Sequence, residues 1–544
     1  MTSIGVLPRH ARGWQFTAWA LCVLGAAWRI AAYAQHRSLW YDEAALALNI
    51  AGRGFVELVE PLDYLQTAPP LFLWIERSIV LLFGANEWAL RALPLAAGMV
   101  TAPLMWRVAS RILPSPAAVL AVALVALSPA LVRYSAEVKP YATDALVTLL
   151  VLDSAVQVAV DPLRSGRWRA LGLVGMAAIV ASTPSVFILA GVTAYLTTGA
   201  LVSRDARSAR RTASLAAGWA GLFLVLLATV FRPLLGDTAP IGKFMHWYWA
   251  ANFLTTEPPG IAAKVSALLW AAFTNTFLGE GAFSGATSVL LLAAVVGLAA
   301  LIASRNVPLA TLLTVPAIAL AAASMLRRYP IAERVILFAA PLTALLIAAS
   351  QIPLSHRRLR SLSPILGGAI TAAVVALAGR GDLARFRSDV GRQESRDLVR
   401  SAVRKHAAGD PVWISGGGEA AWRFYSAAFA ARESRREADA TTSFGGRALA
   451  ADVLVGAWFD APPEQILTMS DDTTAASKPS RWSDTEAMRV RSLARPCALL
   501  FLSHMQPGEV PALLASVTQA GGQLRESRRE PGAELHDVCF ERPA

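Results

Sequence analysis

The pattern of apolar and polar positions changes near residue 380. Before it, long apolar stretches alternate with short polar ones; after it, the two kinds of residue mix as in a soluble domain. The first apolar stretch, 14–34, is long enough to cross a bilayer core of about 30 Å. Ten more bring the predicted spans to eleven: 88–106, 115–132, 141–159, 170–183, 185–202, 213–231, 285–303, 307–325, 335–351 and 363–379.

One short apolar stretch, from Pro69-Pro70 to about residue 83, does not fit this pattern. It has Glu76 and Arg77 at its centre, so it would place two charges in the middle of a bilayer. We therefore predict a helix that lies in the membrane interface rather than one that spans it.

The basic residues give an independent test of the orientation. With the N-terminus inside, eleven spans make 107–114, 160–169, 203–212, 304–306 and 353–362 the cytoplasmic loops. Each of these loops contains arginine, as the positive-inside rule requires. The opposite face then receives the 35–68 loop, the 133–140 loop, the 232–284 loop, the 326–334 loop and everything after 380.

Composition supports the membrane class. Of 544 residues, 55% are hydrophobic and 16% charged, against about 25% charged in soluble domains. The net charge of +12 lies in arginine clusters between apolar stretches, which favours membrane topology over nucleic-acid binding. Three cysteines are too few for a disulfide scaffold, although Cys497 and Cys539, both in the outer region, can form one bond.

The region 380–544 is predicted to be a small α/β domain. We expect a helix over 390–407, strands at 412–415, 453–458, 498–503 and 535–541, and a helix near 509–520. The triple glycine 416–418 follows the first strand and opens a helix that runs to about residue 430. It lacks a dinucleotide or Walker pattern, so a plain turn is favoured over a phosphate cradle.

Three polar motifs fall on the predicted outer face. Asp42-Glu43 is either a chemical pair or a cap for a helix that begins near Ala44. The 133–141 motif, with Asp144 one turn further, is either functional or a set of membrane-anchoring side chains. In 326–334, three arginines oppose the charge bias, so they indicate a phosphate partner, unless Glu333 simply pairs with them.

In order, "LWYDEAALALNI", "TAPPLFLWIERSIVLLFGANEWALRALPLAAG", "LSPALVRYSAEVKPYATDAL" and "RRYPIAERVILFAAPL" resemble the GT-C glycosyltransferases. Within them the chain is most similar to the bacterial relatives of protein O-mannosyltransferases and lipid A aminoarabinose transferases. The resemblance covers about 14–380. It implies a GT-C membrane module over 1–379, with its catalytic outer loop at 35–87, and an extracytoplasmic α/β domain over 380–544.

The resemblance further implies sugar transfer from a polyprenyl-phosphate donor to a glycan, lipid or protein acceptor, on the outer face of a bacterial inner membrane. The residues that match the family's motifs are the acidic Asp42, Glu43 and Glu137, and the phosphate-binding candidates Lys139, Tyr141, Arg328 and Arg334. The histidine that precedes the proline pair in the mannosyltransferases is Ala68 here, which argues against protein O-mannosylation.

Chemistry assigns the roles. Asp42 is expected to be the base, because a transferase of this kind must accept a hydroxyl proton from its acceptor. A divalent metal, Mg²⁺ or Mn²⁺, held by Asp42 and Glu137 is left open, since hard cations take oxygen ligands. Two other functions remain: a lipid or solute transporter, disfavoured because the notable charges lie at one face, and a non-catalytic scaffold for envelope assembly.

Overall fold

The computed structural model describes residues 12–231, 240–256, 259–279, 284–352, 363–387, 392–429, 447–450, 452–457, 479–506 and 508–541. The chain folds into two compact units. The helical unit comprises Met1–Gln35, Ala68–Ser78 and Trp88–Arg387, and the sheet unit comprises His36–Thr67, Ile79–Glu87 and Ser388–Ala544. Residues 36–67, the first predicted outer loop, therefore pack with the C-terminal region.

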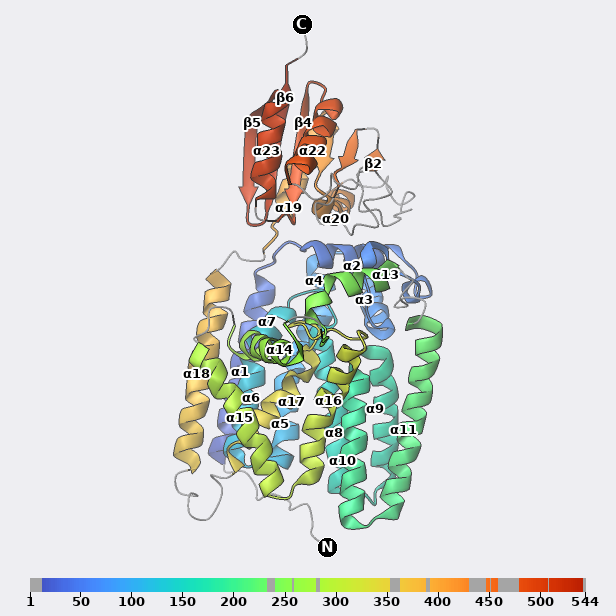
Figure 1. The fold of residues 1–544 in the computed structure, drawn as a ribbon, viewed down its shortest axis with the longest axis vertical. Helices are drawn as coiled ribbons and strands as arrows, with labels where there is room; N and C mark the ends of the chain where they lie inside the picture. Colours follow the sequence, from blue (N-terminus) through green and yellow to red (C-terminus); the bar gives the residue numbers. More distant parts are fainter. Residues whose placement is uncertain are drawn as a thin grey trace. The chain divides into compact units, whose positions relative to one another are not determined.

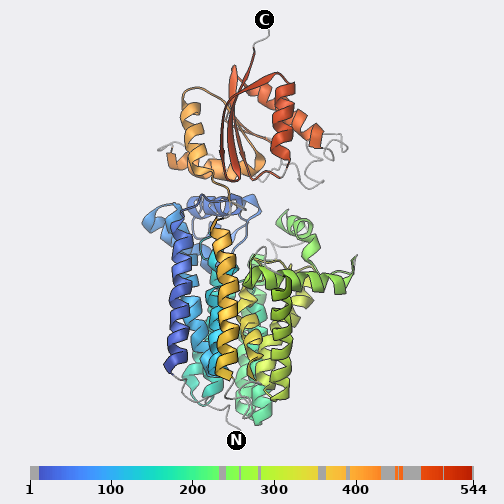
Figure 2. The ribbon, with the colours of Figure 1, turned by 90° about the vertical axis from the view of Figure 1, so that its left-hand side faces the viewer.

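A bundle of long helices makes up most of the helical unit (Figures 1 and 2). Up to residue 387, leaving aside α2 of the sheet unit, the helices are α1 (Arg12–Ala34), α3 (Pro70–Phe83), α4 (Glu87–Leu90), α5 (Ala92–Ile112), α6 (Ser115–Ala126), α7 (Pro129–Tyr134), α8 (Tyr141–Val160), α9 (Ser165–Ala181), α10 (Ser185–Ser203), α11 (Ala206–Leu226), α13 (Pro240–Tyr248), α14 (Ile261–Phe277), α15 (Ser284–Ala303), α16 (Val307–Met325), α17 (Ala340–Ala349) and α18 (Ser363–Arg387).

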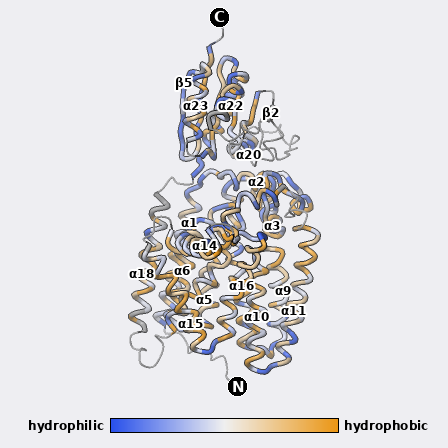
Figure 3. Tube along the Cα trace, viewed as in Figure 1, coloured by the Kyte–Doolittle hydropathy of each residue, from blue (hydrophilic) through white to orange (hydrophobic). Residues whose placement is uncertain are grey.

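The prediction of a multi-span helical membrane protein is confirmed. Within the described ranges, seven helices are long and apolar enough to cross a membrane: Arg12–Ala34, Glu87–Ile112, Tyr141–Val160, Ser185–Ser203, Ala206–Phe231, Gly285–Ala303 and Val307–Met325. Each of the other four predicted spans also contains a helix: α6, α9 and α17 have 12, 17 and 10 residues, whereas α18 has 25. Apolar residues run along the helices, and polar ones gather where α10 meets α11 (Figure 3).

Two differences from the predicted spans have local causes. The span predicted over 115–132 is interrupted, because Pro129 opens a new helix, α7, and the Ser128 hydroxyl accepts the Leu131 N–H at 3.1 Å. The long outer loop 232–284 contains an apolar helix, α14, that the sequence pattern did not reveal. α3 forms as expected; its interfacial placement stays a prediction.

The centre of the helical unit is α6, which is buried from Ala117 to Ala126. Its backbone ends against the Arg29 guanidinium of α1, which donates to the carbonyls of Val125 at 3.1 Å and Ala126 at 2.6 Å. The last carbonyls of a helix have no partner within the helix and carry negative partial charge. Arg29, which interrupts the first apolar stretch, therefore satisfies the end of the central helix.

The sheet unit contains six described strands in the order β2-β3-β1-β4-β6-β5. The strands are β1 (Val412–Ile414), β2 (Arg447–Ala450), β3 (Val453–Val455), β4 (Cys497–Ser503), β5 (Gly522–Glu530) and β6 (Ala533–Phe540). β1 is parallel to both of its neighbours, β3 and β4, and the other pairings are antiparallel. The predicted C-terminal α/β region is therefore present.

Helices cover both faces of this sheet (Figure 2). α22 (Pro479–Leu493) and α23 (Glu509–Gln519) enclose one core, which contains Trp413, Leu500 and Val538. α19 (Arg396–Ala407) and α20 (Glu419–Phe429) belong to the other face, where the Trp422 and Phe501 rings lie 6.2 Å apart. Successive strand residues alternate between the faces, so burial on both makes the central strands continuously apolar.

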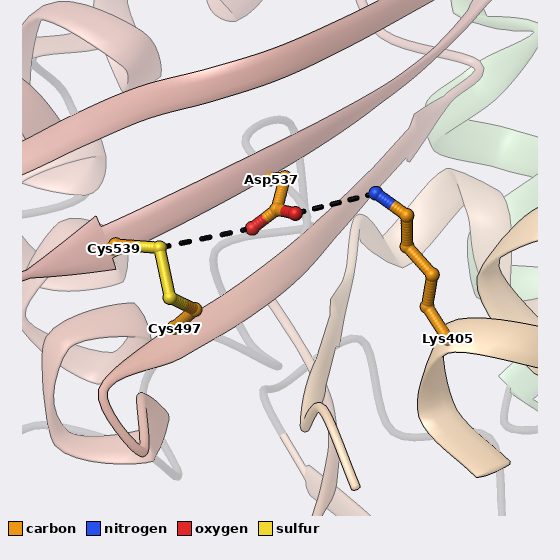
Figure 4. Close-up of a disulfide and its surroundings, with 4 residues drawn as sticks. All are labelled: Lys405, Cys497, Asp537 and Cys539. Carbon is orange, nitrogen blue, oxygen red and sulfur yellow. Dashed lines mark hydrogen bonds and ion pairs between the residues drawn. A yellow bond between two sulfur atoms is a disulfide. The ribbon is translucent and has the colours of Figure 1, made fainter. Parts of the chain in front are cut away.

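Cys497 and Cys539 form a disulfide between the directly paired strands β4 and β6 (Figure 4). Asp537 lies beside it and accepts from the Lys405 ammonium at 3.2 Å. Asp537 and the two sulfur atoms would be spaced suitably for a metal. The disulfide removes the thiolates that such a site needs, so this cluster is a structural cross-link next to an ion pair.

Candidate functional site

The acidic pair lies in the sheet unit, in the first turn of α2 (Tyr41–Gly52). Glu43 is buried, and its carboxylate accepts the Trp40 N–H at 3.3 Å. It therefore caps the helix from within the first turn, because the helix begins at Tyr41 and not near Ala44 as the sequence suggested. Asp42 is half-buried in the same turn. The two neighbours therefore have different surroundings: Glu43 is buried as a cap of α2, and Asp42, the predicted base, is half-buried.

The second motif forms a tight turn in the helical unit, between α7 and α8. The Arg133 guanidinium donates to Glu137 Oε1 at 2.6 Å, and the Lys139 N–H donates to the Glu137 carbonyl at 2.8 Å. Glu137 and Lys139 are both buried. The other carboxylate oxygen of Glu137, Oε2, is buried and has no hydrogen-bond partner among the described residues.

The third motif, 326–334, meets this turn. Glu137 raises the pKa of the Arg133 guanidinium, with a smaller contribution from Glu333, so Arg133 stays charged. Burial raises the pKa of Tyr134, against the opposing charges of Arg133 and Arg334. Arg133 and Arg334 thus both act on Tyr134, although they are far apart in the sequence. We call Arg133, Tyr134, Glu137, Glu333 and Arg334 the outer cluster.

Aromatic residues complete the surroundings of the outer cluster. The Tyr134 and Tyr141 rings contact edge to face, 5.1 Å apart, which places the predicted Tyr141 beside the cluster. The Arg334 guanidinium lies over the Trp249 ring, 5.4 Å from its centre. Trp249 belongs to a segment held by two hydrogen bonds between Asn252 and Ile331.

The two arginines predicted to bind phosphate differ in their exposure to solvent. Arg328 is exposed, whereas Arg334 is half-buried against Trp249. Between them, Tyr329 is packed edge to face against Phe187 and donates its hydroxyl to the Val335 carbonyl at 3.0 Å. Burial raises the pKa of Tyr329 well above its usual value, with further contributions from the charges of Asp144 and Tyr141.

Several residues here were not predicted as site residues. Arg133 and Tyr134 lay within the quoted motif, and Asp144 was noted only as a neighbour. Asp144 is buried in α8, and its Oδ1 atom has no hydrogen-bond partner within the described ranges. Trp249 was missed altogether; the dense aromatic run around Phe244 and Trp247 was the available signal.

The outer cluster combines two arginines with two carboxylates, and Glu137 has one carboxylate oxygen without a partner among the described residues. Arg334 offers hydrogen-bond donors to a phosphate, and Arg133 is neutralised by Glu137. The unpartnered Glu137 Oε2 is a hard oxygen ligand of the kind that Mg²⁺ or Mn²⁺ prefers, so Glu137 fits one ligand of the metal considered from the sequence.

Comparisons with known proteins give two positive findings. Residues 67–236 match the family described as dolichyl-phosphate-mannose-protein mannosyltransferase. The fold resembles ArnT from Cupriavidus metallidurans bound to undecaprenyl phosphate, with TM-score 0.54 and 16% identity over 97% of this chain and 98% of that one.

It also resembles the oligosaccharyltransferase AglB from Archaeoglobus fulgidus in complex with an inhibitory peptide and a dolichol-phosphate, with TM-score 0.50 and 10% identity over 97% of this chain and 74% of that one. At these identities the likeness is one of fold. A search of curated protein sequences gives no significant match.

Proposed function

Since this chain is a multi-pass membrane protein with the GT-C glycosyltransferase fold and a mannosyltransferase family match, we propose that it moves a sugar from a polyprenyl-phosphate donor to an acceptor in the cell envelope. The reaction would take place on the extracytoplasmic face of a bacterial inner membrane, with the N-terminus in the cytoplasm. The acceptor class is a glycan, a lipid or a protein.

The observation that carries the proposal is the outer cluster. A sugar–phosphate donor leaves a lipid phosphate behind, and cations at the departing oxygen lower the barrier. Arg334 and the buried Lys139 are proposed to bind that phosphate, with Tyr141 and the exposed Arg328 as further contacts. One of the structures that this fold resembles, ArnT from Cupriavidus metallidurans, has undecaprenyl phosphate bound, which supports this class of donor.

The proposed reaction is a single displacement. The acceptor oxygen forms a bond to the anomeric carbon of the sugar while the bond from that carbon to the phosphate oxygen breaks. The acceptor proton passes to the Asp42 carboxylate, and the electron pair leaves with the lipid phosphate. Glu43 caps the helix that carries Asp42, and Glu137 holds Arg133 in place.

A divalent metal would take Glu137 Oε2 as one of its ligands. When bound, it would neutralise negative charge on the departing phosphate. Proton transfer to Asp42 and departure of the lipid phosphate would not require the metal.

The test is the Asp42→Asn variant. Envelope glycans are compared by mass spectrometry in cells that lack the protein and in cells that produce the wild type or the variant. We expect Asp42→Asn to lower sugar transfer about 100- to 10,000-fold, the contribution typical of a general base. The matched control is Asp63→Asn, which removes a carboxylate from the same loop, where Asp63 pairs with Arg53 at 3.1 Å; transfer should stay within about twofold of wild type.

Full transfer by Asp42→Asn would exclude Asp42 as the base. Identical envelope glycans with and without the wild-type protein would instead favour the transporter or the scaffold.

A further inference from the structure

Within the sheet unit, the start of α2 is held by side chains from the C-terminal region. The Ser38 N–H donates to Glu394 Oε2 at 3.0 Å. The Leu39 N–H donates to the Tyr425 hydroxyl at 2.7 Å, and the Tyr41 N–H donates to Gln393 Oε1 at 2.9 Å. The first N–H groups of a helix lack intrahelical partners, so Gln393 caps α2 at Tyr41, while the other two contacts hold the residues before the helix.

The place where this segment docks is the edge at which open α/β sheets usually bind ligands. That edge lies at the carboxyl ends of parallel strands, where the strand order reverses. Here β1 ends before the glycines 416–418, and β4 ends directly before His504. A Cβ atom on Gly417 would lie 2.7 Å from the Cβ of His504, so the two strand ends approach as closely as glycine permits.

The start of α2, at Tyr41, occupies this edge. The Tyr41 ring stacks on the His504 ring, with centroids 5.1 Å apart and planes 13° from parallel. The Gln393 side chain bridges the two, because its amide NH₂ group donates to His504 Nδ1 at 2.5 Å while its oxygen accepts the Tyr41 N–H. Gln393 and His504 therefore contact the residue directly before Asp42.

We infer that Gln393 and His504 are positioning residues, which set the orientation of the Asp42 carboxylate through Tyr41. This inference rests on the proposed role of Asp42 as base. The C-terminal region would then hold the first turn of α2 in a fixed position. Fixing Asp42 matters because a displacement of about 1 Å at a reacting group can cost roughly 100-fold in rate.

The alternative is a purely structural role, in which these contacts only hold the C-terminal region together. The two explanations differ in what they predict for binding and for rate. If Gln393 and His504 position Asp42, their loss slows proton transfer and leaves the affinity for the lipid phosphate unchanged. Loss of general packing would lower the stability of the sheet unit and reduce the amount of folded protein.

The experiment uses the full-length protein in lipid nanodiscs and the variants Gln393→Ala and His504→Ala. Amide hydrogen exchange over 38–46 reports whether the start of α2 loosens. We expect exchange there to rise at least about tenfold. In cells that produce these variants, the sugar transfer measured by mass spectrometry of the envelope glycans should fall about tenfold. The Kd for undecaprenyl phosphate should stay within about twofold of wild type.

Two further variants separate positioning from general stability. Gln393→Glu keeps an oxygen for the Tyr41 N–H and should restore most of the exchange protection and transfer lost in Gln393→Ala. Ser516→Ala removes buried hydrogen bonds to Asp484 and Ser483 elsewhere in the sheet unit and should change neither readout over 38–46.

Unchanged exchange over 38–46 in both alanine variants would overturn the inference, as would faster exchange with undiminished transfer. These outcomes are distinct from failure of the proposed function. Full transfer by Asp42→Asn would remove the catalytic premise, whereas the exchange measurement would still report whether Gln393 and His504 hold α2.

Discussion

Glu137 and Arg334 carry opposite charges, and each is held by a different kind of neighbour. Glu137 binds Arg133 through one carboxylate oxygen and leaves the other buried without a described partner. Burying a carboxylate oxygen without a hydrogen bond is costly, so such atoms concentrate where a ligand is bound. Arg334 rests on Trp249, and this contact orients its guanidinium group and restricts its motion.

Arg334 is predicted to contribute strongly to the binding of undecaprenyl phosphate. Arg334→Ala should raise the Kd for undecaprenyl phosphate about 10- to 100-fold, because it removes charge-assisted hydrogen bonds worth about 1.5–3 kcal/mol. Arg334→Lys should lose less, since it keeps the charge but not the planar fork.

Binding can be followed by tryptophan fluorescence of the purified protein. Arg164→Ala, at an exposed arginine in a predicted cytoplasmic loop, is the control and should not change the Kd. Equal losses in both variants would mean that general charge, and not Arg334, attracts the lipid.

At the scale of elements, short-range signals account for most helices and strands. The predicted helices and strands of the C-terminal region correspond to α19, α20, α23, β1, β3, β4 and β6. β5 was missed because five of the nine residues in its sequence, GQLRESRRE, are charged, in runs that hide any alternation of apolar and polar positions. It is an edge strand, mostly exposed, and its register comes from pairing with β6 rather than from its own hydrophobic pattern.

The disulfide between β4 and β6 is predicted to stabilise the sheet unit. Cys497 and Cys539 are 42 positions apart, and a cross-link over such a loop typically stabilises by about 2–4 kcal/mol. Replacing both cysteines by alanine, or reducing the wild type, should lower the midpoint of thermal unfolding by several degrees, measured on the full chain in detergent. The double variant should not respond to reductant. A reductant effect of the same size in the double variant would assign it to another group.

At the scale of the whole molecule, helices are joined through their ends and through close packing. Gly191 of α10 meets Pro316 of α16, where an added Cβ atom would approach the proline ring to 2.5 Å. Small residues at such crossings let membrane helices approach closely. Arg29 serves the same unit electrostatically by binding the end of α6.

Arg29→Leu is therefore predicted to destabilise the helical unit. It leaves the carbonyls of Val125 and Ala126 without their donor and removes a positive charge from a helix C-terminus, at a cost of about 2–3 kcal/mol. Thermal unfolding of the detergent-solubilised protein measures the effect. Arg210→Leu, at an exposed arginine outside such contacts, should change stability by less than about 0.5 kcal/mol. Equal stability of the two variants would show that Arg29 is dispensable for the end of α6.

By itself, the sequence determined the membrane class, the position of most helices and the α/β nature of the C-terminal region, because these depend on periodicity within a few residues. It also singled out the three polar motifs. Only the tertiary structure decided which distant residues come close: the charge of Arg334 acts on Tyr134, and Tyr41 contacts Gln393 and His504. These pairs are separated by hundreds of residues, and local hydrophobic pattern carries no information about which distant side chains become neighbours.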